Sequence, residues 1–475
     1  MGKTRALFLT LLLAAPLAAS LQSQDWPMWG GTPSRNMSSP MTGLPSSWDV
    51  AAGTNIKWAS DLGSTSYGNP VVAGGKVFVG TDNASPRNPA VTGDKGILMC
   101  FREADGAFLW QAVSDKLEAG QGVDWPEQGI CSSPAVVGDR LYYVTNRGEL
   151  VALDTEGFAD GANDGPFEDE ALKGPQDADI VWKLDMMKEL GVVQLYMAAS
   201  SPVVWDDLVF VATSNGRSEE GSVPAPKAPS FIAVNRDTGK VVWQDSSPGD
   251  RILHGQWTSP SLGEIDGVMQ VVFPGGDGWL YAFNARTGAP LWRFDLNPKD
   301  AVWPKTRNYG VATPVFAGGR VYMAVGQDPE NGEGIGHLYA IDPTKSGDIT
   351  ESGRVWQFDK IRRSISTAAV ANGLLYISDF SGFLHCLDAT TGAPYWTFDA
   401  LAAVWGSPLV ADGKVYLGDE DGDVIVLEAG KTMKTLAEPN MGMAVYGTPV
   451  PANGVLYIMN RSKLYAIAAP KAERP

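Results

Sequence analysis

One phrase recurs eight times along this chain of 475 residues, and it limits the fold more than any other feature. Each copy opens with a small residue and an anchor, continues into an apolar run and a turn, and ends in a second strand rich in tyrosine. The anchors are Pro70, Pro134, Pro202, Pro260, Pro314, Ala368, Pro408 and Pro449. Repeats of roughly 40–65 residues made of four short strands are typical of propeller blades. The phrase therefore predicts an all-β chain folded as an eight-bladed β-propeller.

The strands of the first copy can be placed from its turn residues. Residues 70–73 are predicted as strand A, 76–81 as strand B and 97–102 as strand C, and strand D carries Trp110. Tight turns join A to B and C to D, so the strands alternate in direction. The B–C loops and the D–A connections then lie on one face of the ring, which we call the loop-rich face.

The outer strand of most copies carries a tryptophan at the same position, and we expect it to wedge between neighbouring blades. The residues at this position are Trp58, Trp110, Trp182, Trp243, Trp292, Trp356, Trp396 and, in the seventh blade, Lys434.

The two ends of the repeat region complement each other. The last blade stops after a third strand at residues 463–467, whereas residues 55–60 form an unpaired strand carrying Trp58. If this early strand completes the last blade, the ring closes without an open edge. We therefore expect one propeller domain over residues 55–470, an N-terminal extension over 21–54 and a short tail over 471–475.

The first 20 residues have the pattern of a signal peptide, with Lys3 and Arg5 before a short apolar run and small residues after it. The mature chain is expected to be exported, periplasmic or secreted, and soluble, with no transmembrane segment. The net charge of −17 argues against nucleic acid and anionic membranes as partners. Of three cysteines, Cys100 and Cys386 lie in apolar strands, which favours burial; a Cys100–Cys131 disulfide is the alternative.

A motif of the form Ala-x-Asp-x-x-Thr-Gly-x-x-x-Trp occurs with small changes at residues 282–292 and 386–396. It resembles the pyrroloquinoline quinone (PQQ)-like propeller repeat, whose members include quinoprotein alcohol dehydrogenases and BamB-type outer-membrane assembly proteins. Both groups are eight-bladed. The opening phrase at residues 25–31, Asp-Trp-Pro-Met-Trp-Gly-Gly, looks like that of uncharacterised exported propellers of planctomycete-type bacteria.

The resemblance implies a ligand site on the loop-rich face. Similar dehydrogenases hold PQQ there with a vicinal cysteine pair, an aromatic platform, Arg and hydroxyl groups, and a Ca²⁺ ion bound by Glu, Asn and Asp; no two cysteines are adjacent here. Aromatic residues precede four anchors by three positions, and Arg and amide side chains lie nearby. The candidate site residues are Tyr67, Gln256, Trp257, Arg307, Asn308, Arg363, Trp405 and Tyr446.

These residue types suit a small planar or carboxylate-bearing ligand. The alternative is that the aromatic rings plug the channel and the arginines pair with nearby aspartates. A separate acidic loop contains Asp160, Asn163 and Asp164, which we weigh as ligands of a structural calcium ion against a plain solvated loop.

Two functions remain open from the sequence. The first is an exported binding or scaffolding module of the cell envelope, with an envelope protein or a small ligand as its partner. The second is a PQQ-dependent quinoprotein dehydrogenase that oxidises an alcohol or sugar, with PQQ and calcium as cofactors.

Overall fold

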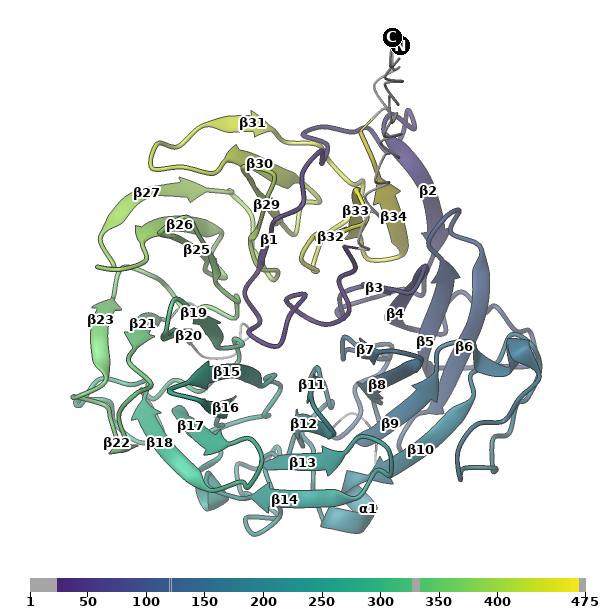
Figure 1. Ribbon diagram of the computed structural model, residues 1–475, viewed down its shortest axis with the longest axis horizontal. Coiled ribbons are helices and arrows are strands. Elements are labelled where there is room, and N and C mark those ends of the chain that lie inside the picture. Colours follow the sequence, from purple (N-terminus) through teal and green to yellow (C-terminus); the bar gives the residue numbers. More distant parts are fainter. Residues whose placement is uncertain (1–23, 119, 121, 327–333, 470–475) are drawn as a thin grey trace, which may run out of the picture.

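The computed structural model describes residues 24–118, 120, 122–326 and 334–469. The predicted signal peptide and C-terminal tail lie outside these ranges. Eight sheets surround a central axis (Figure 1), which confirms the predicted eight-bladed propeller.

Each blade is a sheet of four antiparallel strands, A to D from the axis outward. The strands of blades 1 to 4 are β3 (Val71–Ala73), β4 (Lys76–Asp82), β5 (Lys95–Arg102), β6 (Phe108–Asp115); β7 (Ala135–Val137), β8 (Arg140–Val144), β9 (Glu149–Asp154), β10 (Ile180–Asp185); β11 (Val203–Trp205), β12 (Leu208–Ala212), β13 (Phe231–Asn235), β14 (Val241–Asp245); β15 (Ser261–Ile265), β16 (Val268–Pro274), β17 (Trp279–Asn284) and β18 (Pro290–Asp295).

The strands of blades 5 to 8 are β19 (Val315–Ala317), β20 (Arg320–Val325), β21 (His337–Ile341), β23 (Arg354–Phe358); β24 (Ala369–Ala371), β25 (Leu374–Ser378), β26 (Phe383–Asp388), β27 (Pro394–Asp399); β28 (Leu409–Ala411), β29 (Lys414–Gly418), β30 (Val424–Glu428), β31 (Thr435–Ala437); β32 (Val450–Ala452), β33 (Val455–Met459), β34 (Lys463–Ile467) and β2 (Ile56–Asp61).

Further short elements extend this frame. Strand β22 (Gly347–Asp348) joins β18, and β1 (Ser38–Ser39) joins β28. The helical elements are α1 (Met186–Leu190), η1 (Gly157–Asp160) and η2 (Gly249–Arg251). Among the described residues, no helix has the length and apolar character needed to cross a membrane.

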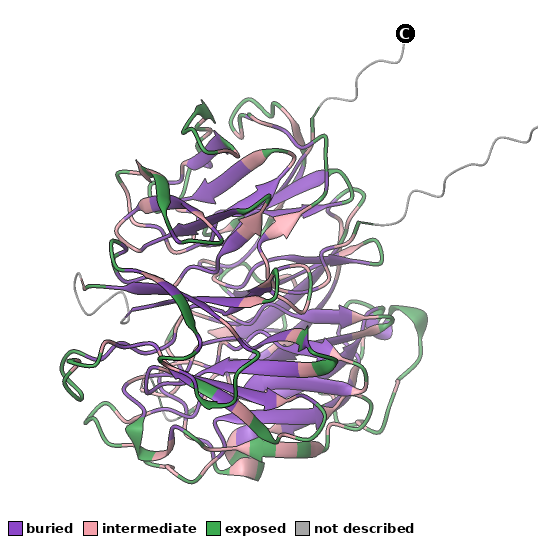
Figure 2. Cartoon of the chain, turned by 60° about the vertical axis from the view of Figure 1, so that its left-hand side comes forward, coloured by how far each residue is buried: buried purple, intermediate pink, exposed green. Residues whose placement is uncertain are grey.

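Burial decreases from the inside of each blade to its outer edge (Figure 2). All five residues of β12 are buried, because strand B packs against a neighbouring blade on each face. The outer strand β14 instead mixes intermediate and exposed positions. Continuous apolar runs are therefore found in strands B and C, and polar residues enter in strand D.

The ring closes through a sheet drawn from both ends of the chain. Strand β2 pairs antiparallel with β34, with Ser60 opposite Leu464. Figure 1 shows the purple β2 beside the yellow β34. Blade 8 therefore has its outer strand from residues that precede the first blade.

The outer-strand tryptophans join each blade to the next. Trp58 of blade 8 donates from its indole Nε1 to the Glu103 carbonyl of blade 1 at 2.9 Å, and its ring covers Gly106. Trp110, Trp182, Trp243, Trp356 and Trp396 donate in the same way to a carbonyl of the following blade. Trp292 differs, because it donates to the side-chain oxygen of Gln270.

A segment before the first blade crosses the channel, and we call residues 24–48 the strap. It binds the backbone of inner strands two residues after their anchors: Val72, Val136, Leu262, Phe316, Val370 and Val410. The remaining two blades are also held, blade 8 by Gln24 bound to Asn453 and blade 3 by Arg35. In Figure 1 the strap is the purple chain that runs over the centre of the ring.

Arg35 anchors the strap at the axis. Its side chain has no exposed surface, and its guanidinium donates to the carbonyl oxygens of Pro260 (2.9 Å), Trp29 (2.8 Å), Ser201 (2.9 Å) and Pro202 (2.8 Å). Burial lowers the pKa of Arg35 to about 9, so it stays charged at neutral pH. One buried cation thus ties the strap to blades 3 and 4.

We expect the contact between tryptophan and glycine to limit substitution at Gly106. A Cβ there would lie 2.6 Å from Cε3 of Trp58. Gly75 is the matched control, because both residues have positive φ (72° and 75°) but a Cβ at Gly75 meets nothing within 4 Å. Gly106→Ala should reduce the free energy of unfolding in urea by about 2 kcal/mol more than Gly75→Ala. Equal losses would show that the ring contact is not tight.

Replacement of Arg35 should destabilise the propeller far more than loss of a surface arginine. Arg35→Met leaves four buried carbonyls without their donor, so we expect a loss of about 3 kcal/mol or more in urea unfolding. The control is Arg102→Met, which breaks a half-exposed pair with Asp105 and should cost about 0.5 kcal/mol or less. Similar losses in the two variants would contradict the anchoring role.

Candidate functional site

A cavity of about 320 Å³ lies on the axis, and we call it the cup. Its wall follows the register of the repeat. The residues three positions before the anchors form an upper, apolar ring: Tyr67, Cys131, Ala199, Trp257, Val311, Ile365 and Trp405. The residues one position before the anchors form a lower ring of hydroxyl groups: Ser133, Ser201, Ser259, Thr313 and Thr367. All belong to D–A connections, so the cup lies on the loop-rich side of the strap.

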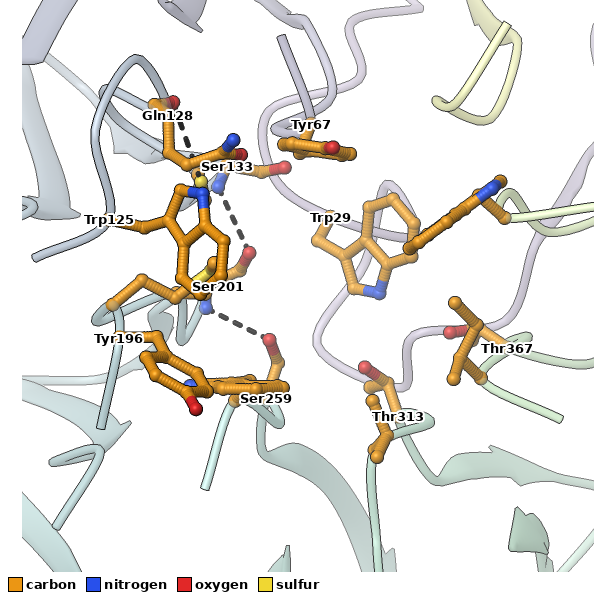
Figure 3. Close-up of a pocket in the computed structure, with 17 residues that line it drawn as sticks. Trp29, Tyr67, Trp125, Gln128, Ser133, Tyr196, Ser201, Ser259, Thr313 and Thr367 are labelled. Carbon is orange, nitrogen blue, oxygen red and sulfur yellow. Dashed lines mark hydrogen bonds between the residues drawn. The ribbon is translucent and has the colours of Figure 1, made fainter. Parts of the chain in front are cut away.

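The lower ring is held by hydrogen bonds that pass from blade to blade. The backbone N–H of Ser133 donates to the Ser201 hydroxyl (3.0 Å), and the N–H of Ser201 donates to the Ser259 hydroxyl (2.9 Å), as Figure 3 shows. Equivalent bonds join Asn69 to Ser133, Thr367 to Ser407, Ser407 to Thr448 and Thr448 to Asn69. Within the described ranges, the bond is missing from Ser259 to Thr313 and from Thr313 to Thr367.

The strap closes the cup from below. Trp29 of the strap lines the cavity and stands between Trp125 on one wall and Thr367 on the other in Figure 3. The backbone carbonyl of Trp29 accepts a hydrogen bond from Arg35. Because the strap binds six blades two residues after their anchors and the other two through Gln24 and Arg35, the channel becomes a recess that opens toward the loop-rich face.

Two groups of aromatic rings form the mouth of the recess. On one side, Trp125 meets Tyr196 edge-on, with ring centroids 5.0 Å apart, and Tyr196 lies 6.3 Å from Trp257. On the other side, Tyr67 lies 6.1 Å from Trp405 and stacks on Tyr446 at 5.3 Å. A ligand that enters the cup passes between these two groups.

The cup is electrically neutral. None of the described residues that line it has a carboxylate, ammonium or guanidinium group. Burial raises the pKa of Tyr67 to about 12 and the pKa of Cys131 to about 12, so both groups stay protonated at neutral pH. Charged groups act on the wall from outside it: Arg461 and Glu420 act on Tyr67, and Lys116 and Asp124 act on Cys131.

Sequence comparison places this architecture in a family. A family model described as outer membrane protein assembly factor BamB matches residues 94–254, 175–323 and 276–471, which together cover most of the chain. The chain belongs to this family of PQQ-like propellers.

Two curated relatives carry different names. BamB of Yersinia pestis is 24% identical over 380 residues, with 77% of this chain and 74% of that protein aligned. A polyvinylalcohol dehydrogenase of a Sphingopyxis species is 21% identical over 369 residues. That alignment covers 67% of this chain but only 47% of the dehydrogenase, so the chain spans about half of that enzyme's length.

Solved structures share the fold of this PQQ-like propeller. BamB from Moraxella catarrhalis has a TM-score of 0.56 at 16% identity, over 88% of this chain and 98% of that one. A quinohemoprotein alcohol dehydrogenase from Comamonas testosteroni has a TM-score of 0.65 at 14% identity, over 95% and 82%. A europium-containing methanol dehydrogenase has a TM-score of 0.64 at 14% identity, over 94% and 98%.

The structure separates the candidate site residues of this propeller into two sets. Tyr67, Trp257 and Trp405 line the cup, and Tyr446 lies behind Tyr67. The other four candidates, Gln256, Arg307, Asn308 and Arg363, are buried but do not line the cup.

Specific contacts hold the second set away from the axis. Gln256 binds the Asn215 carbonyl at 2.6 Å, and Arg307 forms a two-bond ion pair with Asp295, at 2.6 and 3.1 Å. The Asn308 amide donates to the Ile335 carbonyl at 3.1 Å, and the Arg363 guanidinium lies 5.4 Å from the ring centre of Phe380.

Several lining residues were not among the sequence candidates: Trp29, Trp125, Tyr196 and the hydroxyl ring. The sequence could have indicated the hydroxyl ring, since a small polar residue directly precedes most anchors. The indication for Trp29 was weaker and consisted only of its place in the opening phrase at residues 25–31. Nothing in the repeat pointed to Trp125 or Tyr196, which lie in connections of irregular length.

The acidic loop and the cysteines form no metal site in the described ranges, where no group of three or more His, Cys, Asp or Glu residues is placed to hold an ion. Asp164 pairs with Arg140 at 3.4 Å, Asp160 accepts from the Ala162 N–H, and Asn163 is exposed. The cysteines are free thiols, and no disulfide joins Cys100 to Cys131.

His254 beside the cup should titrate far below neutral pH. It stacks on Tyr309 at 5.6 Å and meets Trp257 edge-on, and burial, aided by the charge of Arg217, lowers its pKa to about 4. In the unfolded chain a histidine titrates at about 6.5. The unfolded state therefore takes up a proton first as pH falls, and His254 reduces stability between pH of about 6.5 and 4.

An NMR titration of the His254 ring protons should give a midpoint near the lower value. His254→Gln should flatten the pH dependence of urea unfolding within that window and leave it unchanged above it. A midpoint near 6.5 would contradict the burial of the ring.

Proposed function

We propose that this propeller is exported, with residues 1–20 as its signal peptide, and serves as a binding module of the cell envelope. The observation that carries the proposal is the cup: a recess on the axis, closed by the strap and lined by aromatic rings and hydroxyl groups without a charged side chain. Mostly apolar recesses with a few polar groups are typical sites for small molecules. Membership of a family described as outer membrane protein assembly factor BamB supports a place in the envelope.

The residues of the cup do not fit PQQ. This cofactor is planar, which suits the aromatic walls, but it carries carboxylate groups whose burial requires cationic partners. The two arginines proposed for that role lie elsewhere: Arg307 is paired with Asp295, and Arg363 lies over Phe380. The described wall also lacks the carboxylate oxygens with which proteins hold Ca²⁺. We therefore derive no redox step at this site.

The rim of the recess offers a surface for a protein partner. Leu401 is 87% exposed and Met443 is 44% exposed, and both lie in D–A connections on the loop-rich face. Val302 is 57% exposed in another such connection. Exposed apolar side chains around a recess are typical of interaction surfaces. An envelope protein that docks at this rim would cover the mouth of the cup.

A titration of the purified mature protein with PQQ, with and without Ca²⁺, tests the proposal against the dehydrogenase alternative. We expect no saturable binding in calorimetry and no dye-linked oxidation of alcohols or sugars. Small molecules extracted from protein purified from its host should include one that is lost in Val311→Phe, which fills the cup. Val302→Phe on the rim is the control and should retain it.

The possible results separate the functions. Tight, Ca²⁺-dependent PQQ binding with turnover would replace this proposal by the dehydrogenase. Absence of any retained molecule, together with reproducible capture of one envelope protein, would support a scaffold without a ligand and contradict the cup as a binding site.

A further inference from the structure

The aliphatic hydroxyl groups of the cup lie in its lower part. The upper ring and the aromatic mouth are mostly apolar, with Val311, Ile365 and Met197 among the tyrosine and tryptophan rings. Gln128 is the amide side chain in this part of the wall. The hydroxyls one position before the anchors and the indole of Trp29 lie deeper, next to the strap. A ligand in the cup therefore meets apolar walls around its body and polar groups at one end.

The cup contains donors without a partner, and two of them, the indole N–H groups of Trp29 and Trp405, can only donate. The oxygens of Ser133, Ser201 and Ser259 each accept a backbone N–H from the preceding blade, and no hydrogen bond from these hydroxyls to a described residue occurs. Each hydroxyl thus keeps its hydrogen for another acceptor. The indole Nε1 atoms of Trp29, beside the strap, and of Trp405, in the upper ring, are buried and have no partner among the described residues. A buried donor without an acceptor is costly, so a ligand that supplies one gains affinity.

The size and charge of the cup narrow the ligand further. Its volume of about 320 Å³ has room for a bicyclic ring system with a small substituent. The neutral wall penalises a charged ligand, since a buried charge needs a partner. A sugar carries hydroxyl groups around its whole rim, and many of them would face the mostly apolar upper ring without a partner.

We infer that the cup binds a flat, uncharged aromatic ketone: a ring between the aromatic walls, with a carbonyl oxygen directed to the indole and hydroxyl donors. This inference rests on the proposed function, in which the cup is the ligand site. The upper ring selects a flat apolar body. The two indole N–H groups and the hydroxyl ring select an acceptor at its edge.

Three naphthalene probes test the inference by titration of tryptophan fluorescence and calorimetry. 2-Acetylnaphthalene carries the carbonyl, naphthalene lacks it, and 2-naphthoate replaces it with a charge. We expect the ketone to bind about tenfold more tightly than naphthalene, which corresponds to one well-placed hydrogen bond. The naphthoate should bind more weakly than either.

Matched variants assign the preference to specific donors. Trp29→Phe and Trp405→Phe keep an aromatic ring but remove the N–H, so the ketone should lose most of its advantage in at least one of them while naphthalene affinity changes little. Trp243→Phe is the control, because Trp243 lies on the outer strand β14, does not line the cup, and donates its Nε1–H to the Ala285 carbonyl of the next blade. The ketone preference should survive there.

Each remaining result decides a different question. Equal binding of ketone and naphthalene, survival of the preference in both cup variants, or tighter binding of naphthoate overturns the inference. Binding of N-acetylglucosamine or cellobiose without the aromatic probes overturns it too, but leaves the cup as a ligand site. If no probe binds and Val311→Phe changes nothing that is retained on purification, the proposed function fails with it.

Discussion

Closure of the ring is the constraint on which the other features of this propeller depend. The fourth strand of blade 8 is β2, which precedes blade 1, so the two ends of the repeat are held in one sheet. The contact between Trp58 and Gly106 then joins that sheet to blade 1 in the same way that other blades are joined. The one outer position without a tryptophan is Lys434 in blade 7. Blade 8 explains it: its third and fourth strands come from opposite ends of the chain, so it has no C–D turn for a tryptophan to cover.

The same register that builds the ring also builds the cup. In six blades the residue two positions after the anchor binds the strap. The residue directly before the anchor supplies a hydroxyl to the cup in five blades, and the residue three positions before it supplies a mostly apolar wall in seven. A β-strand advances by about 3.3 Å per residue, so a fixed offset in sequence becomes a fixed depth along the axis. The site is thus a layered structure in which each depth has one chemical character.

The sequence was sufficient for the features that repeat. Strand β34 has the bounds predicted from its apolar pattern, and Tyr67, Trp257 and Trp405 were placed at the axis from their offset alone. The positions of the arginines were not predicted correctly. Arg307 lies in a long D–A connection, where the number of residues to the anchor no longer determines the position along the axis, and its ion pair with Asp295 fixes its side chain instead. The strap was not foreseen either. The strap binds mostly backbone groups of the blades, and the side chains of Arg35 and Asn36 also bind backbone atoms, so no pair of complementary side chains in the sequence indicates it.

The strap also determines what kind of recess this propeller has on its axis. A propeller channel without a floor is open along its axis, whereas here residues 24–48 provide a floor at a defined depth. Trp29 places an aromatic ring in that floor. The guanidinium of Arg35 donates to backbone carbonyls of the strap and of the blades, so its positive charge does not face the wall of the cup. The ligand chemistry is then set mainly by seven side chains at one offset and five at the other, together with Trp29 and residues of the longer connections. Because those positions carry little of the blade packing, they can change from charged to neutral while the ring keeps its fold.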